Sequence, residues 1–218
     1  MKKILLINFL LLLVFLPTFG MAKDLSSVQM VGIRMGFWNA VKADKVHSTP
    51  DLEISNKITA PYAEVFIAPG LKKGFTLEFS FGSCYRGETR YHDSYGYYWK
   101  SVTVYPVSGG LKFYPLSSVK NSKCQPYLHL GVAFITGVEN IRLGEYYGSS
   151  ILLQEGTNTY TTLGWLAGAG MDFILSRHLV IGADFKYRGV NFNDEVGGLK
   201  NFNGPQATLG ISYIVKGI

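Results

Sequence analysis

Apolar and polar residues alternate with a period of two in eight segments of this chain, as they do in β-strands that have one apolar face. In the clearest segment, Phe75, Leu77 and Phe79 alternate with Thr76 and Glu78. The eight segments start near Val28 and then cover about 62–71, 75–90, 98–115, 128–134, 162–173, 179–188 and 207–215. Segments of roughly ten residues match the length of a tilted strand that crosses a bilayer.

The connections between these segments alternate in length. Those at 72–74 and 176–177 are tight turns, and the one at 117–125 is of medium length. The others are longer and polar or aromatic, and they lie at about 41–60, 91–97, 143–159 and 192–204. Short turns at one end and long loops at the other are typical of outer-membrane barrels. The sequence therefore predicts an all-β fold, an eight-stranded antiparallel up-and-down transmembrane β-barrel.

The two faces of the predicted strands differ in a way that favours a membrane barrel. A soluble β-sandwich also alternates, but its polar face meets water, and a lipocalin-type barrel needs an apolar lumen. Here the apolar face carries no charge over the central positions, and the polar face mixes small residues with charges of both signs, as a narrow lumen requires. Six cations nearly balance five anions there, which buried charges require. The expected lumen ion-pair network comprises Arg34, Glu64, Glu78, Arg86, Glu88, Arg90, Lys112, Asp172, Asp184, Lys186 and Arg188.

Aromatic residues gather toward both ends of the predicted strands, where transmembrane barrels carry girdles at the membrane interfaces. One group comprises Phe37, Trp38, Tyr91, Tyr95, Tyr97, Tyr98 and Trp99, and the other comprises Phe113, Tyr114, Tyr127 and Phe173. We expect both groups to lie at the interfaces. The aromatic second loop is alternatively an adhesive tip, because exposed Tyr and Trp make effective contact residues.

The N-terminus has the features of a secretion signal. Lys2 and a second lysine precede an apolar stretch, and Gly20 and Ala22 supply small residues at a cleavage site. An uncleaved membrane anchor is the alternative, but the apolar stretch is short for a spanning helix. We therefore expect a signal peptide at 1–22 and one barrel domain at 23–218.

Composition narrows the class further. The chain of 218 residues is 47% hydrophobic and 14% aromatic, which is too apolar for a disordered protein. Beyond the N-terminal apolar stretch, the chain has no apolar run of about 18 residues, so a helical membrane protein is excluded. The net charge of +6 is scattered along the chain, and we expect no nucleic-acid binding.

The two cysteines are predicted to remain thiols. Cys84 falls near the outer end of its strand and Cys124 in a turn at the opposite end. A bilayer thickness of roughly 20 Å or more should separate them, whereas a disulfide needs Cα atoms within about 7 Å.

Residues with catalytic or metal-binding chemistry are sparse. His129 and His178 fall in the inward register, and neither has a Ser two residues away on the lipid face, as an outer-wall deacylase would require. In the long loops, His47 with Asp51 and His92 with Asp93 do not match the spacing of a zinc motif. We expect no catalytic residue, no cofactor and no metal site.

Several stretches resemble the OmpA-, OmpX- and OmpW-like outer-membrane β-barrel family. They are Gly109–Tyr114 followed by Gln125–Gly131, Gly164–Phe173 followed by Leu179–Tyr187, and Gly210–Tyr213. The likeness covers most of the chain after residue 22 and rests on patterns rather than on an invariant motif. One departure is the ending Lys216-Gly217-Ile218, where such barrels usually finish on an aromatic residue.

The resemblance implies a location and a set of partners. It implies the outer membrane of a Gram-negative-type bacterium, with outer-membrane lipid, the barrel-assembly machinery and an extracellular ligand at the long loops as partners. Our leading hypothesis is a non-enzymatic protein with a closed, ion-paired lumen and a structural or loop-mediated interaction role. The alternatives are a small OmpW-like channel for hydrophobic solutes and a lipid A-modifying enzyme.

The signal peptide generates the first testable prediction. Cleavage after Ala22 should leave Lys23 as the first residue of protein recovered from the outer-membrane fraction. N-terminal sequencing of that fraction checks the prediction. A retained Met1, or recovery of the protein from the soluble periplasm, would contradict it.

Overall fold

The computed structural model describes residues 28–40, 52–54, 59–72, 74–92, 96–117, 123–147, 150–197 and 199–217. The predicted signal peptide lies outside these residues. The strands are β1 (Val28–Asn39), β2 (Leu52–Ile54), β3 (Thr59–Lys72), β4 (Phe75–His92), β5 (Gly96–Phe113), β6 (Cys124–Tyr147), β7 (Ser150–Ile174), β8 (Leu179–Val196), β9 (Leu199–Asn201) and β10 (Gly204–Gly217). No helix in this part of the chain has the length and apolar character to cross a bilayer.

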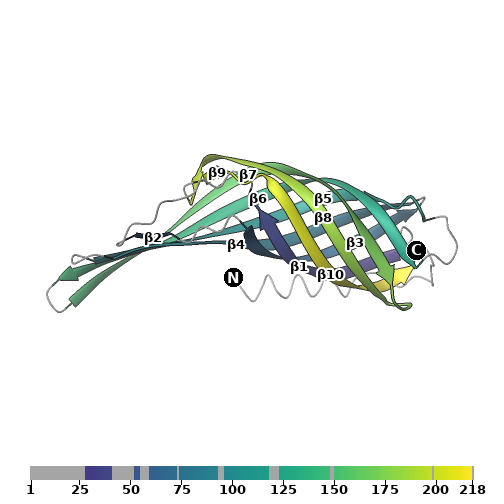
Figure 1. The fold of residues 1–218 in the computed structure, drawn as a ribbon, viewed down its shortest axis with the longest axis horizontal. Coiled ribbons are helices and arrows are strands. Elements are labelled where there is room, and N and C mark those ends of the chain that lie inside the picture. Colours follow the sequence, from purple (N-terminus) through teal and green to yellow (C-terminus); the bar gives the residue numbers. More distant parts are fainter. Residues whose placement is uncertain are drawn as a thin grey trace.

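Eight of the strands form a closed antiparallel ring (Figure 1). Going around the barrel, the order is β1, β3, β4, β5, β6, β7, β8 and β10, and β10 closes the ring by pairing with β1. Each of these strands pairs with its neighbours along the chain, which is an up-and-down topology. The predicted eight-stranded barrel is confirmed.

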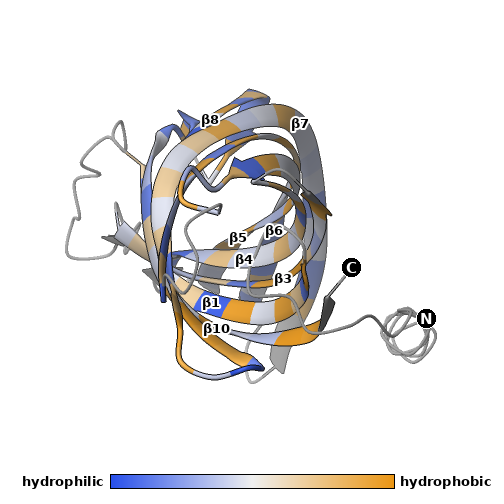
Figure 2. Cartoon of the chain, turned by 90° about the vertical axis from the view of Figure 1, so that its right-hand side faces the viewer, coloured by the Kyte–Doolittle hydropathy of each residue, from blue (hydrophilic) through white to orange (hydrophobic). Residues whose placement is uncertain are grey.

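The alternating pattern separates an apolar outside from a polar inside. Hydrophobic and hydrophilic residues alternate along the strands of the ring (Figure 2), and the buried and exposed side chains alternate with them. The outward residues include large, exposed apolar side chains: Ile33, Met35, Phe37, Phe79, Phe81, Val107, Leu111, Leu130, Val132, Phe134, Leu163, Phe185, Leu209 and Ile211. Since a folded chain in water rarely exposes a contiguous apolar belt of this size, the surface is suited to lipid.

Strands β4 to β7 continue beyond the ring as a projecting sheet (Figure 1). β6 pairs with β7 as far as Tyr147 and Ser150, and β4 pairs with β5 as far as His92 and Tyr97. Most of the predicted loops at 91–97 and 143–159 is therefore strand, and the sequence prediction was wrong there. Outside the bilayer both faces of a strand can meet water, so no alternation marks it in the sequence.

The other two predicted long loops also contain strand. β2 lies within 41–60 and pairs with β4 at the margin of the projecting sheet, through Glu53 and Arg90 among others. β9 lies within 192–204 and pairs with the outer end of β8. Both strands have only three residues, too few for a period-2 pattern to be recognised.

A β-bulge in β4 corrects the predicted positions of Glu88 and Arg90. The pairing of β4 with β5 shifts register between Tyr85 and Gly87, and Gly87 has φ = 116°, a conformation that favours glycine. The extra residue reverses which side chains point inward. Glu88 and Arg90 therefore lie on the outside of the sheet, and Arg90 has 59% of its side chain exposed.

Three residues of the predicted aromatic girdles point into the barrel instead. Trp38 and Tyr114 are fully buried, and Tyr127 is nearly so. Their outward neighbours Phe37 and Phe113 are exposed, as strict alternation requires. Clustering at a strand end does not by itself identify a girdle, because every second aromatic residue faces the lumen.

The cysteines occupy opposite ends of the barrel, as predicted. Cys84 is fully buried and pairs in register with Tyr62 and Val104, whereas Cys124 starts β6 opposite Phe173. No disulfide joins them.

The outward register predicts an asymmetric cost of introducing arginine. Phe79→Arg should destabilise the inserted barrel by about 2–4 kcal/mol, because it places a charge in the apolar belt. Thr159→Arg, on an exposed part of the projecting sheet, should cost less than about 0.5 kcal/mol. Urea titration of each variant folded into lipid vesicles checks this. Equal costs at the two positions would show that the belt does not contact lipid.

Candidate functional site

A layer of charged side chains fills the middle of the barrel. The cations are Arg34, Lys112, Lys186 and Arg188, and the carboxylates are Glu64, Glu78, Asp172 and Asp184. They are supplied by β1, β3, β4, β5, β7 and β8 at inward positions, and each is at most 6% exposed. Four residues of each sign lie in this layer, and opposite charges offset much of the cost of burial. Seven of the eight form ion pairs with one another, and Asp172 accepts a hydrogen bond from the Tyr114 hydroxyl at 2.8 Å.

Arg34 is the centre of this charged layer. Its Nη1 donates to Glu64 Oε1 at 2.8 Å and to Glu78 Oε1 at 2.8 Å, and its Nη2 donates to Glu78 Oε2 at 2.6 Å. Asp184 Oδ2 lies 3.7 Å from Nη1. The guanidinium also stacks over the ring of Phe66, 3.7 Å from its centroid. The planar fork of arginine suits this bidentate contact.

Two lysines complete the contacts of the same carboxylates. Lys186 Nζ lies 3.0 Å from Asp184 Oδ2, 3.3 Å from Glu64 Oε1 and 3.4 Å from Glu78 Oε1. Lys112 Nζ lies 2.6 Å from Glu78 Oε2. Glu78 therefore contacts cations from three strands, which ties β1, β5 and β8 to β4 across the lumen.

Arg188 lies at the edge of the layer and links it to neutral polar groups. It contacts Glu64 Oε2 at 3.5 Å and donates to the hydroxyl oxygens of Tyr62 at 3.0 Å and Ser108 at 3.1 Å. It also donates to the Gln206 side chain. The Tyr62 hydroxyl in turn donates to Glu64 at 2.7 Å.

Apolar clusters lie on both sides of the charged layer, and the sequence analysis missed them. The outer cluster comprises Trp38, Ala60, Tyr62, Cys84, Val102, Val104, Ala133, Ile135, Val190, Phe192, Val196 and Phe202. The inner cluster, toward the short turns, comprises Val28, Met30, Phe66, Ala68, Tyr114, Tyr127, Val180 and Ile214. The sequence does contain a signal for these clusters. If the period-2 alternation is continued to the strand ends, it places most of these residues on the inward face.

The hairpin of β8 and β9 folds over the outer mouth of the barrel. Val196 at its tip is fully buried, and the Gly197 N–H donates to Glu139 of β6. Glu139 also pairs with Lys100 at 2.7 Å. These contacts reach β5 and β6 across the mouth, so the hairpin contributes to the outer apolar cluster.

Inward glycines make room for the large side chains of the lumen. Across the strand pairs, Gly32 lies opposite Phe66, and Gly210 lies opposite Arg34. A Cβ on Gly32 would approach the Phe66 ring to 2.7 Å, and one on Gly210 would approach Arg34 Cγ to 2.5 Å. The sequence has 25 glycines, and these two inward ones allow large side chains to pack inside a narrow ring.

Three of the eleven residues predicted for the ion-pair network lie elsewhere. Arg86 is buried higher in the barrel, where it donates to the Trp38 carbonyl at 3.2 Å and stacks on Trp38. Glu88 and Arg90 pair with each other outside the lumen. There the Trp99 indole N–H donates to Glu88 at 3.0 Å and lowers the pKa of that carboxyl.

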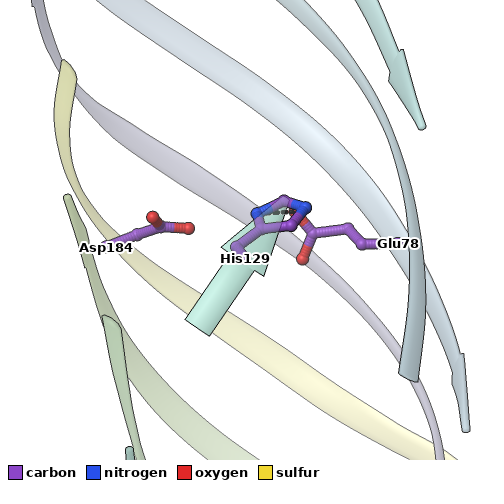
Figure 3. Close-up of side chains that lie close together, drawn as sticks. All are labelled: Glu78, His129 and Asp184. Atoms are coloured by element: carbon purple, nitrogen blue, oxygen red, sulfur yellow. Dashed lines mark ion pairs between the residues drawn. The ribbon is translucent and has the colours of Figure 1, made fainter. Parts of the chain in front are cut away.

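One group of side chains has the composition of a metal site. Donor atoms of Glu78, His129 and Asp184 all lie within 4.8 Å of one another (Figure 3). However, Glu78 is held by Arg34 and Asp184 by Lys186 at the distances given above. A divalent cation would have to displace these groups, so we interpret the cluster as part of the charged layer.

The structure describes the side chains of two histidines, His129 and His178. His129 is buried in the lumen, as predicted. His178 was also predicted to face inward, and that prediction was wrong: it lies exposed at the turn before β8, with Nδ1 3.4 Å from the Ile214 carbonyl and its ring stacked on Tyr213, which is exposed. His47, Asp51, Asp93 and the His92 side chain lie outside the described residues.

Comparisons with known proteins identify the fold. No family model matches the sequence, and no curated protein matches it. The structure is similar to the outer membrane protein OprG from Pseudomonas aeruginosa, with a TM-score of 0.53 and 14% identity over 86% of this chain and 95% of that one. It is also similar to a major outer membrane protein from Thermus thermophilus, with a TM-score of 0.51 and 13% identity over 85% of this chain and 98% of that one.

The central position of Arg34 predicts a large cost for its removal. Arg34→Met should lower the free energy of unfolding by about 3–5 kcal/mol, because Glu64 and Glu78 lose their guanidinium partner in the barrel interior. Glu78→Gln added to Arg34→Met should recover part of that loss. Urea titration in detergent micelles measures the free energy of unfolding of the wild-type protein and of both variants.

The matched control removes an exposed pair. Arg142 contacts Glu155 at 2.9 Å, but their side chains are 55% and 66% exposed, so Arg142→Met should cost about 1 kcal/mol or less. A loss for Arg34→Met no larger than this would show that the charged layer does not stabilise the barrel.

Proposed function

We propose that this chain is a non-enzymatic outer-membrane β-barrel protein with a closed lumen, and that it acts through the part that projects from the membrane. The observation that carries the proposal is the complete burial of the charged layer inside an apolar-faced ring. The proposal includes export by the signal peptide, insertion by the barrel-assembly machinery and residence in the outer membrane of a Gram-negative-type bacterium.

The outer surface of the ring supports a position in a membrane. Exposed apolar side chains surround the barrel, and Leu163 and Leu209 have 77% and 68% of their surface exposed. A closed ring also leaves no unpaired strand edge within this belt, which a bilayer requires. The likeness to outer-membrane proteins adds support at the level of the fold.

The filling of the lumen supports closure. Lys112, Lys186 and Arg188 in the charged layer are each at most 1% exposed, so water does not reach them from either end. The outer and inner apolar clusters also fill the lumen, with large side chains such as Trp38 and Tyr114. An eight-stranded ring is just wide enough for side chains to fill.

The arrangement of polar groups supports a role without catalysis. The inward histidine, His129, lies among ion-paired carboxylates and has no access to substrate. The projecting sheet of β4 to β7 extends away from the barrel (Figure 1) and carries exposed charged side chains, among them Arg90, Arg142 and Glu155. We therefore assign an interaction role to this sheet.

The closed lumen predicts the absence of ion conduction. The wild-type protein should show no conductance steps in planar bilayers. The variant with Trp38→Ala, Arg188→Ser and Tyr114→Ala removes one large side chain from each layer and should show steps, provided that it still migrates as a folded barrel in unboiled gels. A large, stable conductance of the wild type would contradict closure and favour a channel.

A further inference from the structure

The outer part of β7, residues 150–163, is an open edge of the projecting sheet. β6 pairs with β7 along all of these residues, but β8 joins β7 only from Gly164 onward. At its outer end β8 pairs with β9 instead. Among the described residues, no strand therefore pairs with the second side of 150–163, and only the Thr162 hydroxyl, at the inner end, donates to β8, to the Asn191 carbonyl at 2.6 Å. The side chains of 153–163 are exposed or half-buried, and a Cβ added to Gly156 would meet nothing within 4 Å.

The open edge lacks the features that normally prevent strand pairing. Proteins guard such edges with lysine, proline, bulges or very short strands. Residues 150–163 contain no Lys, Arg or Pro, and their pairing with β6 is free of bulges. The one charged residue, Glu155, pairs with Arg142 of β6. By contrast, the other margin of the sheet is covered by β2, which has only three residues.

The exposed main chain determines what can bind there. Every second residue of an edge strand presents an unpaired N–H and C=O. Only another extended backbone can form hydrogen bonds with all of these groups at once. Four threonines, Thr157, Thr159, Thr161 and Thr162, favour the extended conformation of this edge. The occupant is therefore a β-strand.

We infer that this strand is the same edge of a second copy, paired antiparallel about Thr157. This inference rests on the interaction role proposed above and specifies its partner. In that register Thr157 faces its own copy, Glu155 faces Thr159, and Leu153 faces Thr161. No like charges meet: Thr157 pairs with Thr157, Thr161 pairs with the apolar Leu153, and Thr159 pairs with Glu155. Threonine pairs of this kind are favourable cross-strand contacts.

The direction of the projecting sheet determines how two copies meet. The sheet extends away from the ring along the long axis of the molecule (Figure 1). Two copies in one membrane point the same way, so their β7 edges run parallel. Antiparallel pairing therefore joins copies whose barrels lie at opposite ends, that is, in two membranes that face each other.

Charged substitutions at Thr157, the residue that faces its own copy, test this pairing. Phosphatidylcholine vesicles carrying the full-length protein should aggregate, and vesicles carrying only Thr157→Lys or only Thr157→Glu should not, since like charges then face each other. Mixing the two variant populations should restore aggregation. Thr103→Lys, on the half-buried outer face of the interior strand β5, is the matched control and should leave aggregation unchanged.

A second variant has the opposite expected effect. Thr159→Lys faces Glu155 of the other copy twice in each pair, so it should lower the dissociation constant about threefold to tenfold. Sedimentation velocity in detergent micelles measures this constant. Unboiled gels report separately whether each variant has folded, so that failure to form a barrel is distinguished from failure to pair.

Three outcomes would overturn the inference. Folded wild-type protein that neither aggregates vesicles nor dimerises in micelles would exclude self-pairing while leaving the outer-membrane barrel intact. Aggregation that survives Thr157→Lys would place the contact elsewhere. Failure of the mixed Lys and Glu populations to aggregate, with each variant folded, would exclude the antiparallel register about Thr157.

Discussion

The narrow interior of an eight-stranded ring is the constraint on which the rest of this structure depends. A ring of this size has room for side chains but not for a water channel around them, so every charge that points inward must find an opposite charge or a hydrogen-bond partner inside. Arg34 illustrates the solution, because one guanidinium contacts Glu64 and Glu78 while its flat face covers Phe66. The glycines opposite the largest side chains then become a requirement of the same geometry.

The side chains on the outside of the ring must be apolar, but only over the part of each strand that contacts lipid. Within the apolar belt, residues such as Phe79 and Leu130 must be apolar because nothing else can contact hydrocarbon. Beyond the belt, β4 to β7 continue as strands whose outer face carries Glu88, Arg90 and Arg142. The strands themselves do not stop at the membrane boundary; only the rule that selects their side chains changes.

This change explains how much of the fold could be predicted from the sequence. The alternation around Glu78, Lys112 and Lys186 correctly predicted both the ring and the inward face of the charged residues. It failed at Glu88 and Arg90, because one extra residue at the bulge reverses the faces and the sequence pattern stays polar throughout. It also failed for the projecting sheet, where no apolar face exists to be recognised. The exact ion pairs depend on strand stagger, which sequence periodicity does not contain.

The contacts of Arg34 have a consequence for the order in which the barrel assembles. β1 carries Arg34 near the start of the ring, β10 supplies the facing Gly210 at its end, and Asp184 reaches the guanidinium from β8 on the far side of β10. The contact between Arg34 and Asp184 can therefore form only after the last strand has joined the first. If β10 closed one residue out of register, Gly210 would no longer lie opposite Arg34 and its inward and outward residues would exchange faces. The charged layer thus stabilises only a barrel in which β1 and β10 pair in the correct register. A barrel closed in another register lacks these ion pairs and is less stable than the finished one.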